Sequence, residues 1–472
     1  MRSDANGPVA DLLNSACGCS RRVEGRSALV QAHSVLEGVS AAKGPWQAIV
    51  VPGGALERST VVAAKAYGAA RASRIRRVVL LGLGEGESVG VPQGPMTAMG
   101  STHVALDQEA CALLANYPGF KAMPLNASPD LRAQLPFIAA LWPKAGLVPL
   151  AIGSAGDEKL ARLGGVLKNV LDEDTLVVAV SGWTHFGPLF DGPRMAGAPS
   201  EIAGELTRRE ATAVEALLAR DPQSLAARLG RESVNACGRA PLLLLLTALG
   251  PGERGQVFGR GSSFDKADAV DSLSGVSYLA AGFEGRYPPV PALCDEDRLA
   301  LGALAQEAVA AAVQGRPARS VIEPSPRLRQ RGGAFVTLEQ QGRLRGCMGR
   351  LEAPTLAQAI SEAGAMAAEG DPRFNPLRPD ELPSIEIEIS VLSRFHTLES
   401  IEEFEPGRHG LLLTSGYHRG LLLPQVATKY AMDRDEFLEA LADKAGLAPG
   451  GWRDATLQRF GVEAFSPEPM AR

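Results

Sequence analysis

The chain has 472 residues, of which 45% are hydrophobic and 21% are charged, and its formal net charge is -5. Because one hydrophobic core usually organises about 100 to 200 residues, this length predicts two domains. The weak negative charge argues against a nucleic-acid partner, and the absence of any run near the roughly 20 apolar residues of a membrane helix argues against a membrane protein.

The first 39 residues form a divergent segment that carries Asp4 and Asp11 and lacks the continuous apolar core of a secretion signal. The six cysteines are mostly far apart, as in reduced cytosolic proteins. Cys17 and Cys19 form a C-x-C pair, but no second pair follows, so the zinc signature is poor. We expect a cytoplasmic protein.

From residue 46 onward, short apolar runs alternate with helical patterns. Strands are predicted at 46–54, 76–84, 146–153, 175–182 and 275–283, and helices at 59–73, 157–172, 200–230 and 240–250. This rhythm predicts an α/β domain with a mostly parallel sheet covered on both faces. The Pro-rich segment 285–294 then marks a domain boundary.

After this segment the order of elements changes. An alanine-rich helix is predicted at 295–315, a strand, turn and strand at 333–349, a half-buried strand at 385–393 and a hairpin at 410–424. Asp433 and Glu436 form a capping box at the start of a last helix that ends at Gly446. Because strands and helices do not alternate as βαβ units, the second domain is predicted to be α+β.

Three predicted strands of the first domain end near Gly53, Glu85 and His185. In open α/β sheets, ligands bind beyond the carboxyl ends of the strands, so these positions are expected to meet in one crevice. A single histidine after a strand is more often a hydrogen-bonded structural residue than a ligand. The residues by themselves therefore leave the role of His185 open.

Several segments of the first domain are similar, in order, to the Memo family, the system protein B of the bacterial AmmeMemoRadiSam set. They are QAIVVPGGALERSTVVAAKAY, RRVVLLG, QLPFI, SGWTHFG and CGRAP. The resemblance covers residues 40–284. It implies a fold related to the class III extradiol ring-cleaving dioxygenases.

The chain departs from the Memo pattern where that family carries histidines. The family histidines fall here at Gly53, at Glu85 and near Pro129, and an acidic residue falls at Gly182. Three candidate metal ligands remain: Glu85, His185 and Cys237. A non-haem iron site needs two histidines and a carboxylate.

Two readings of these departures follow. In one, Glu85, His185 and Cys237 bind a divalent transition metal and serve a dioxygenase-like oxidoreductase. In the other, which is favoured, the pocket is a degenerate, metal-free remnant that admits a ligand without reacting with it. No cofactor is assigned.

The second domain resembles the AMMECR family, system protein A of the same set, over residues 295–466, with 467–472 as a tail. The segments that carry this resemblance are GAFVTLEQQGRLRGCMGRLE, AAEGDPRFNPLRPDEL, IEIEISVLS, GLLLTSGYHRGLLLPQVATKY and FLEALADKAGL. The family has no established reaction, so the resemblance implies a relationship rather than an activity.

Cys347 lies between Gly346 and Met348 in the predicted strand of the AMMECR-like domain. With period-two alternation, Arg343 and Arg345 would share its face and favour a reactive thiolate. Against this catalytic role, free cysteines are often buried, and glycines in a strand indicate a bulge or close backbone approach. Both readings of Cys347 stay open.

The turn DPRFNPL places Asp371 and Arg373 close together, and Arg419 follows His418 in the predicted hairpin. If these elements meet, Arg345, Cys347, Asp371, Arg373 and Arg419 form a basic pocket for a small anionic ligand or a peptide carboxylate. The alternative is that Asp371 only fixes the direction of the chain.

The two resemblances together imply a partner. Proteins of these two families accompany a radical S-adenosylmethionine enzyme, and this sequence has no C-x3-C-x2-C cluster motif of its own. We therefore expect an accessory or substrate-presenting protein that acts with a separate radical enzyme. Whether the chain itself catalyses a reaction does not follow from the sequence.

Overall fold

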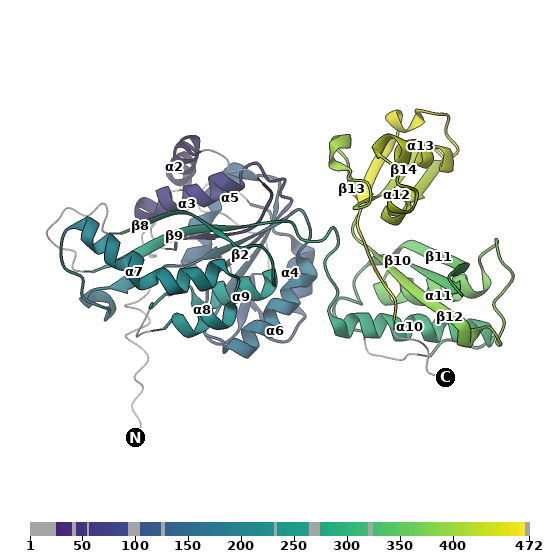
Figure 1. Ribbon diagram of the computed structural model, residues 1–472, viewed down its shortest axis with the longest axis horizontal. Helices are drawn as coiled ribbons and strands as arrows, with labels where there is room; N and C mark the ends of the chain where they lie inside the picture. Colours follow the sequence, from purple (N-terminus) through teal and green to yellow (C-terminus); the bar gives the residue numbers. More distant parts are fainter. Residues whose placement is uncertain are drawn as a thin grey trace, which may run out of the picture. The chain divides into compact units, whose positions relative to one another are not determined.

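The computed structural model describes residues 25–39, 44–53, 56–92, 104–123, 128–230, 234–263, 274–319 and 324–467. The chain forms two compact units (Figure 1). Unit 1 comprises Met1–Lys168 and Asp174–Arg286, and unit 2 comprises Asn169–Glu173 and Tyr287–Arg472. The division after Arg286 falls inside the Pro-rich segment 285–294. Cys17 and Cys19 lie outside the described residues.

Unit 1 is built on a nine-stranded sheet in the order β4-β3-β5-β2-β6-β1-β9-β7, with β8 paired to β9. Its strands are β1 (Trp46–Val51), β2 (Arg77–Leu83), β3 (Val89–Pro92), β4 (Phe120–Met123), β5 (Gly146–Ile152), β6 (Thr175–Val180), β7 (His185–Phe186), β8 (Gln256–Ser262) and β9 (Gly275–Glu284). The central strands β5, β2, β6 and β1 are parallel, whereas β9 runs antiparallel to β1. The predicted α/β class with a mostly parallel sheet is confirmed.

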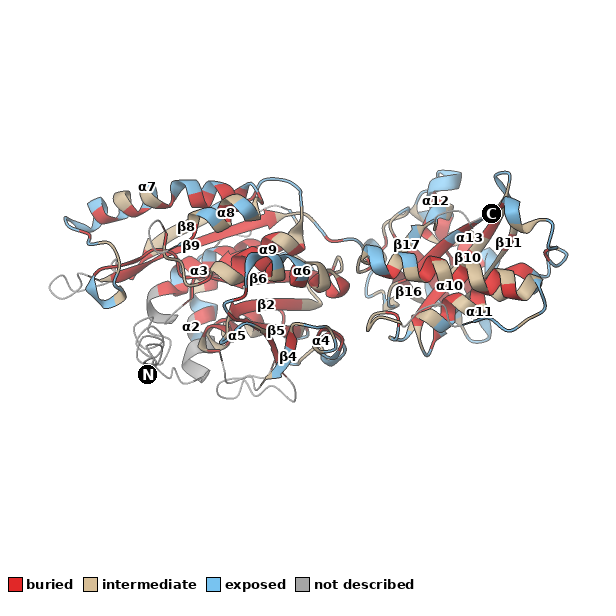
Figure 2. Cartoon of the chain, turned by 90° about the horizontal axis from the view of Figure 1, so that it is seen from below, coloured by how far each residue is buried: buried red, intermediate tan, exposed pale blue. Residues whose placement is uncertain are grey.

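Helices cover both faces of this sheet, which explains why its central strands are apolar throughout. They are α2 (Gly25–Glu37), α3 (Leu56–Ala70), α4 (Gln108–Ala115), α5 (Pro129–Leu141), α6 (Asp157–Leu167), α7 (Pro199–Leu218), α8 (Pro222–Arg228) and α9 (Arg239–Leu249). Every residue of β1 and of β6 is buried (Figure 2). The apolar run predicted as a buried helix is α9, which packs on β6 and β2.

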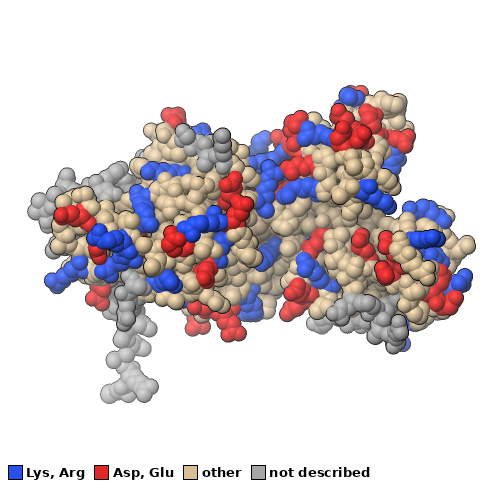
Figure 3. Space-filling model, in the orientation of Figure 1, with Lys and Arg blue, Asp and Glu red and all other residues tan. Residues whose placement is uncertain are grey.

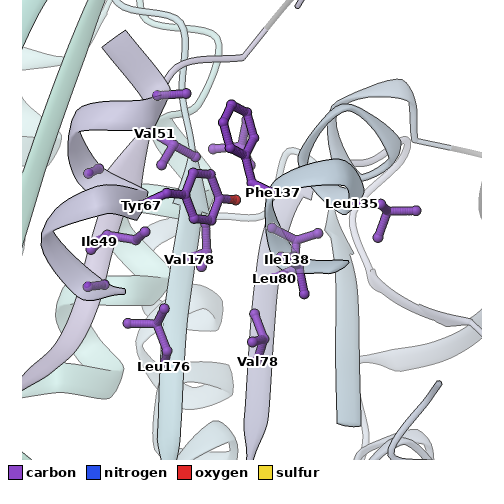
Figure 4. Close-up of a cluster of buried hydrophobic side chains, with 14 of the residues drawn as sticks. Ile49, Val51, Tyr67, Val78, Leu80, Leu135, Phe137, Ile138, Leu176 and Val178 are labelled. Carbon is purple, nitrogen blue, oxygen red and sulfur yellow. The ribbon is translucent and has the colours of Figure 1, made fainter. Parts of the chain in front are cut away.

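One side of the unit 1 core is closed by α3 and α5 (Figure 4). Tyr67 of α3 stacks on Phe137 of α5 with ring centroids 4.7 Å apart. The Tyr67 hydroxyl donates to Gln134 Oε1 (3.1 Å), and Gln134 Nε2 donates to the carbonyl oxygen of Pro52 (3.3 Å). The buried polar groups of α3 and α5 are thus tied to the carboxyl end of β1.

Unit 2 contains two four-stranded antiparallel sheets, in the orders β11-β10-β12-β17 and β13-β16-β14-β15. The strands are β10 (Gly332–Gln340), β11 (Arg343–Ala353), β12 (Ile385–Leu392), β13 (His396–Thr397), β14 (Gly410–Ser415), β15 (His418–Leu422), β16 (Thr456–Phe460) and β17 (Val462–Phe465). Helices α10 (Asp295–Val313) and α11 (Leu356–Glu369) pack with the first sheet, and α12 (Pro424–Tyr430) and α13 (Arg434–Lys444) with the second. The predicted α+β class is confirmed.

Local sequence signals explain several of these elements. In β12 the isoleucines 385, 387 and 389 are buried, and Glu386 and Glu388 between them are exposed, as period-two alternation predicts. The capping box of Asp433 and Glu436 is present at the start of α13.

Charged side chains of both signs are interspersed over the face of the molecule shown in Figure 3. Within the described residues, no helix is both long and apolar enough to span a bilayer.

Candidate functional site

Cys347 lies on the face of the first unit 2 sheet that points away from α11. Thr337 of β10 pairs with Cys347 on one side and with Glu388 of β12 on the other, so the three side chains form one row across the sheet. The opposite face is covered by α11. Gly346, the residue before Cys347, points to that face, and a Cβ there would lie only 2.2 Å from the carbonyl oxygen of Ala367 in α11. Cys347 is half-buried, and the Thr337 hydroxyl lies 3.3 Å from its Sγ.

The expectation that Arg343 and Arg345 share the face of Cys347 is wrong. The register of β10 against β11 shifts between Leu338, which pairs with Gly346, and Glu339, which pairs with Leu344. Arg345 is therefore the extra residue of a β-bulge, and the alternation is interrupted there. Leu344, not an arginine, shares the face of Cys347.

The bulge directs Arg345 toward the segment that follows α11. Its guanidinium makes a bidentate ion pair with Glu381 (2.9 and 3.0 Å) and donates to the carbonyl oxygens of Asn375 (2.9 Å) and Pro376 (3.3 Å). Because Nε and both Nη atoms already have protein acceptors, Arg345 holds the turn in place. It was predicted as a ligand-binding residue, and this arrangement favours a structural role instead.

Asp371 and Arg373 do meet Cys347, as the sequence predicted. The backbone N–H of Cys347 donates to Asp371 Oδ2 (2.9 Å), and Arg373 donates to the same carboxylate from Nε (2.9 Å) and Nη2 (2.7 Å). Asp371 is buried, and the hydrogen bonds from Arg373 hold the pKa of its carboxyl well below the usual range. Arg373 Nη2 also lies 3.3 Å from the carbonyl oxygen of Cys347.

A second cation beside Cys347 is Lys444, at the end of α13. Its side chain is exposed as a whole, yet burial of the ammonium group lowers its pKa, the charge of Arg373 lowers it further, and Cys347 raises it. Lys444 lies 97 positions after Cys347 in the sequence, and no local pattern marks it. Lys444 was therefore not predictable from the sequence.

Arg419 is not brought into this group. It is exposed on β15, where its backbone pairs with that of Thr414, and its guanidinium makes no hydrogen bond or ion pair with a residue in the described part of the chain. Its neighbour His418 contacts the carbonyl oxygen of Ala445 through Nδ1 (2.9 Å). We call Cys347, Thr337, Asp371, Arg373 and Lys444 the thiol site of unit 2.

In unit 1, His185 and Cys237 are brought together at the carboxyl end of β6. A Cβ added at Gly182 would lie 3.0 Å from Cys237 Sγ and 3.3 Å from His185 Cε1. Burial lowers the pKa of His185, but Cys237 and the backbone carbonyls of Trp183 and Asn235 together raise it further, so its pKa is above the usual value. His185 is 4% exposed and Cys237 is half-buried.

Glu85 does not join this pair in a metal-binding cluster. It is exposed in the turn after β2, and among the described residues no three His, Cys, Asp or Glu side chains are close enough together to hold a metal ion. One imidazole and one thiol do not fit the donor set of a non-haem iron site. Binding of a divalent metal by Glu85, His185 and Cys237 stays a prediction.

Two buried acids near the same sheet edge were not anticipated. Glu210 of α7 accepts hydrogen bonds from the Thr184 hydroxyl (2.8 Å) and from the Ser277 hydroxyl and is paired with Arg260 (2.9 Å). Asp130 lies beside Gly53, whose added Cβ would be 3.1 Å from Oδ1. Neither acid has a distinctive local pattern, so only the fold reveals them.

Comparison with known proteins gives two family matches. Residues 27–281 match the model of the Memo-like proteins, and residues 302–465 match the model named AMMECR1. A protein of Methanothermobacter thermautotrophicus is 45% identical over 147 residues, which cover 29% of this chain and 76% of the relative. A Methanosarcina barkeri protein is 44% identical over 137 residues, covering 28% and 68%.

Two solved structures of uncharacterized proteins are also similar. The one from Pyrococcus horikoshii shares 32% sequence identity and a TM-score of 0.36, with 38% of this chain and 96% of that chain covered. The one from Escherichia coli K12 shares 17% identity and a TM-score of 0.31, with 51% and 100% covered.

Proposed function

Because this chain belongs to the Memo-like family through residues 27–281 and carries an AMMECR1 domain at 302–465, we propose that it is a fused accessory protein of a radical S-adenosylmethionine enzyme. In this proposal the thiol site of unit 2 binds the carboxylate of a small molecule or a peptide. The chain presents that ligand to the separate radical enzyme.

The observation that carries the ligand-binding proposal is the pair of cations beside Cys347. Arg373 and Lys444 supply two positive charges, and Asp371 supplies one negative charge. Arg373 uses Nε and Nη2 on Asp371, but its Nη1 donates to no acceptor in the part of the chain that the structure describes. A carboxylate can therefore take a charge-assisted hydrogen bond from Arg373 and pair with Lys444.

The row formed by Cys347, Thr337 and Glu388 ends at Glu388, and this end favours a cationic group. Glu388 follows Thr337 across the sheet. Its side chain is exposed as a whole, but partial burial of the carboxyl and the charge of Glu339 raise the pKa of Glu388. A ligand that carries both a carboxylate and an ammonium group would place each near the opposite charge. Amino acids and peptide termini have this chemistry.

Cys347 has two roles compatible with this arrangement. Its thiol is held against the sheet by Thr337, and its backbone by Asp371. It either contacts the ligand as a small, polarisable group or reacts with it as a nucleophile. Thiol chemistry at Cys347 is the second candidate function, and the proximity of Arg373, whose Nη2 lies 3.3 Å from the carbonyl oxygen of Cys347, supports it.

Ligand binding is tested with glycylglycine and glycylglycinamide, which differ only in the terminal carboxylate. Isothermal titration calorimetry of the full chain should detect binding of glycylglycine. Glycylglycinamide should bind at least about tenfold more weakly, since a charged hydrogen bond contributes about 1.5 to 3 kcal/mol. Arg373→Gln and Lys444→Gln should each weaken glycylglycine binding, whereas the exposed control Arg378→Gln should not. Equal affinities for acid and amide, or no binding by any dipeptide, would reject the ligand class.

The partnership is tested separately by affinity capture of the tagged chain under anaerobic conditions. What supports it is the presence of both family domains in one polypeptide. A co-purifying protein with an iron–sulfur absorbance and a radical enzyme sequence is the expected result. Its absence from repeated captures, with dipeptide binding intact, would reject the partnership and leave the ligand site standing.

A further inference from the structure

The row formed by Cys347, Thr337 and Glu388 crosses three neighbouring strands on one face of the first unit 2 sheet. β11 pairs with β10 at Cys347 and Thr337, and β10 pairs with β12 at Thr337 and Glu388. The row therefore runs perpendicular to the strands. Because neighbouring strands lie about 4.8 Å apart, the backbones at Cys347 and Glu388 are separated by about 10 Å.

Arg373 extends this row beyond the edge of the sheet. β11 is the outer strand, and the backbone N–H of Cys347 points away from β10, since it donates to Asp371 Oδ2 (2.9 Å). Arg373 Nη2 lies 3.3 Å from the carbonyl oxygen of the same Cys347. The guanidinium thus occupies the place that a further strand would take. It lies about three strand spacings, or about 14 Å, from the backbone at Glu388.

The other end of the row carries uncompensated negative charge. Glu386 and Glu388 are exposed on the same face of β12, and Glu339 of β10 pairs with Glu386. None of the three carboxylates forms an ion pair with a residue in the part of the chain that the structure describes. Among the described residues, no three acids are close enough together to hold a metal ion. An organic cation is therefore the ligand that this end of the row fits.

The separation of the two charged ends sets the length of a ligand that reaches both. A charge-assisted hydrogen bond takes up about 2.8 Å at each end, which leaves about 9 Å between the carboxylate and the ammonium group of the ligand. An extended chain spans about 3.3 to 3.6 Å per residue. A single amino acid or a dipeptide is therefore too short, and an extended chain of three residues fits.

We infer that the row binds a zwitterionic tripeptide in an extended conformation that crosses the strands. Its carboxylate accepts from Arg373 Nη1 and pairs with Lys444, its central residue lies over Thr337, and its ammonium group donates to Glu388. This inference rests on the ligand site of the proposed function. It adds the length of the ligand and makes Glu388 the residue that selects a free amino end.

The test compares peptides of different length by isothermal titration calorimetry of the full chain. Triglycine should bind at least about tenfold more tightly than glycylglycine, because only triglycine reaches both ends and gains a second charge-assisted hydrogen bond. Pentaglycine has to fold back to place both ends, so it should bind more weakly than triglycine. N-Acetyltriglycine keeps the length and the carboxylate but lacks the ammonium group, and it should bind about as weakly as glycylglycine.

Two variants assign the ends of the peptide. Glu388→Gln should bind triglycine and N-acetyltriglycine with equal affinity, because the partner of the ammonium group is lost. Arg373→Gln should weaken both peptides by the same factor, because it acts on the carboxylate that they share. Glu352→Gln is the matched control. Glu352 is 62% exposed on β11 and pairs with Arg331, and this variant should keep the wild-type preference for triglycine.

Two outcomes would overturn the inference alone. The first is equal affinity of the wild type for glycylglycine and triglycine, and this comparison does not depend on whether any variant folds. The second is a preference for triglycine over N-acetyltriglycine that persists in Glu388→Gln. In both cases, tighter binding of glycylglycine than of glycylglycinamide would leave the carboxylate site of the proposed function standing. Absence of binding by every peptide, in contrast, would reject the inference and the ligand site together.

Discussion

The backbone N–H of Cys347 donates a 2.9 Å hydrogen bond to Oδ2 of Asp371. The same carboxylate accepts from the backbone N–H of Arg373 (3.1 Å) and from its guanidinium. A single buried acid thus joins the strand that carries the thiol to the turn that carries the cation.

Replacement of Asp371 should destabilise unit 2. In Asp371→Ala the backbone N–H of Cys347 and the guanidinium of Arg373 lose their common acceptor. Because Asp371 is 2% exposed but the Arg373 side chain is 55% exposed, we expect a loss of about 1 to 3 kcal/mol, the cost of unmade hydrogen bonds rather than of a fully buried ion pair. Urea unfolding followed by circular dichroism measures the change. Asp380→Ala is the matched control, because Asp380 is 70% exposed and a surface ion pair such as the one it makes with Arg378 contributes little to stability. Equal losses in the two variants would contradict this account.

The stability of unit 2 should fall in acid through the same residue. The folded pKa of Asp371 is lowered, so its contribution is complete above its unfolded pKa, near 4, and is lost as the pH falls toward the folded value. Glu307 behaves alike, because Arg316 lowers its pKa to about 2. The urea midpoint of the wild type should drop steeply below about pH 4, and in Asp371→Asn it should drop less. If the urea midpoints of the two proteins fell equally with pH below about 4, Asp371 would not be the cause of the acid sensitivity.

Glu210 should contribute far more to stability than Glu215 of the same helix. Glu210 is 2% exposed and holds Arg260, Thr184 and Ser277, whereas Glu215 is 62% exposed and pairs with Arg254. Glu210→Ala should cost about 3 to 5 kcal/mol, and Glu215→Ala about 0 to 1 kcal/mol. Thermal unfolding monitored by tryptophan fluorescence compares the variants. A small effect of Glu210→Ala would mean that the buried network is not needed to hold the strand end before His185.

Tyr67→Phe tests the polar link between α3 and α5. The change keeps the ring that stacks on Phe137 but leaves Gln134 Oε1 buried without the hydroxyl that donates to it. An unsatisfied buried acceptor costs about 1 to 3 kcal/mol, measurable as a shift of the unfolding midpoint. Tyr430→Phe removes a hydroxyl from a side chain that is 62% exposed and should change stability by less than about 0.5 kcal/mol.

Much of the fold follows from patterns within short stretches of sequence. Continuous apolar runs predicted β1 and β6 because strands covered on both faces have no solvent side. Alternation predicted β12 because its sheet has one covered face. The grouping of residues 169–173 with unit 2, in which Glu173 accepts from Arg408 (2.7 Å), had no such signal.

The candidate sites were predictable only in part. Cys347, Asp371 and Arg373 were named from nearby motifs and do meet. The assumed face of Arg345 was wrong because a one-residue bulge reverses every side chain beyond it, and β-bulges leave only a weak trace in sequence. His185 and Cys237, which the family resemblance named as candidate metal ligands, both lie beside Gly182 at the end of β6, whereas Glu85, expected in the same crevice as His185, is in an exposed turn.

The sequence by itself was enough to identify the two families, the class of each domain and the chemical types of residue that can react. These depend on local periodicity and on the residues of short sequence motifs. Only the tertiary structure decided which charges surround each thiol. Lys444, at the end of α13, acts electrostatically on the group around Cys347 across 97 positions of sequence, and Gly182 lies beside both His185 and Cys237, which are 52 positions apart. Electrostatic and hydrogen-bond energies depend on distances of a few ångströms, and those distances are set by the packing of elements that are remote in the chain.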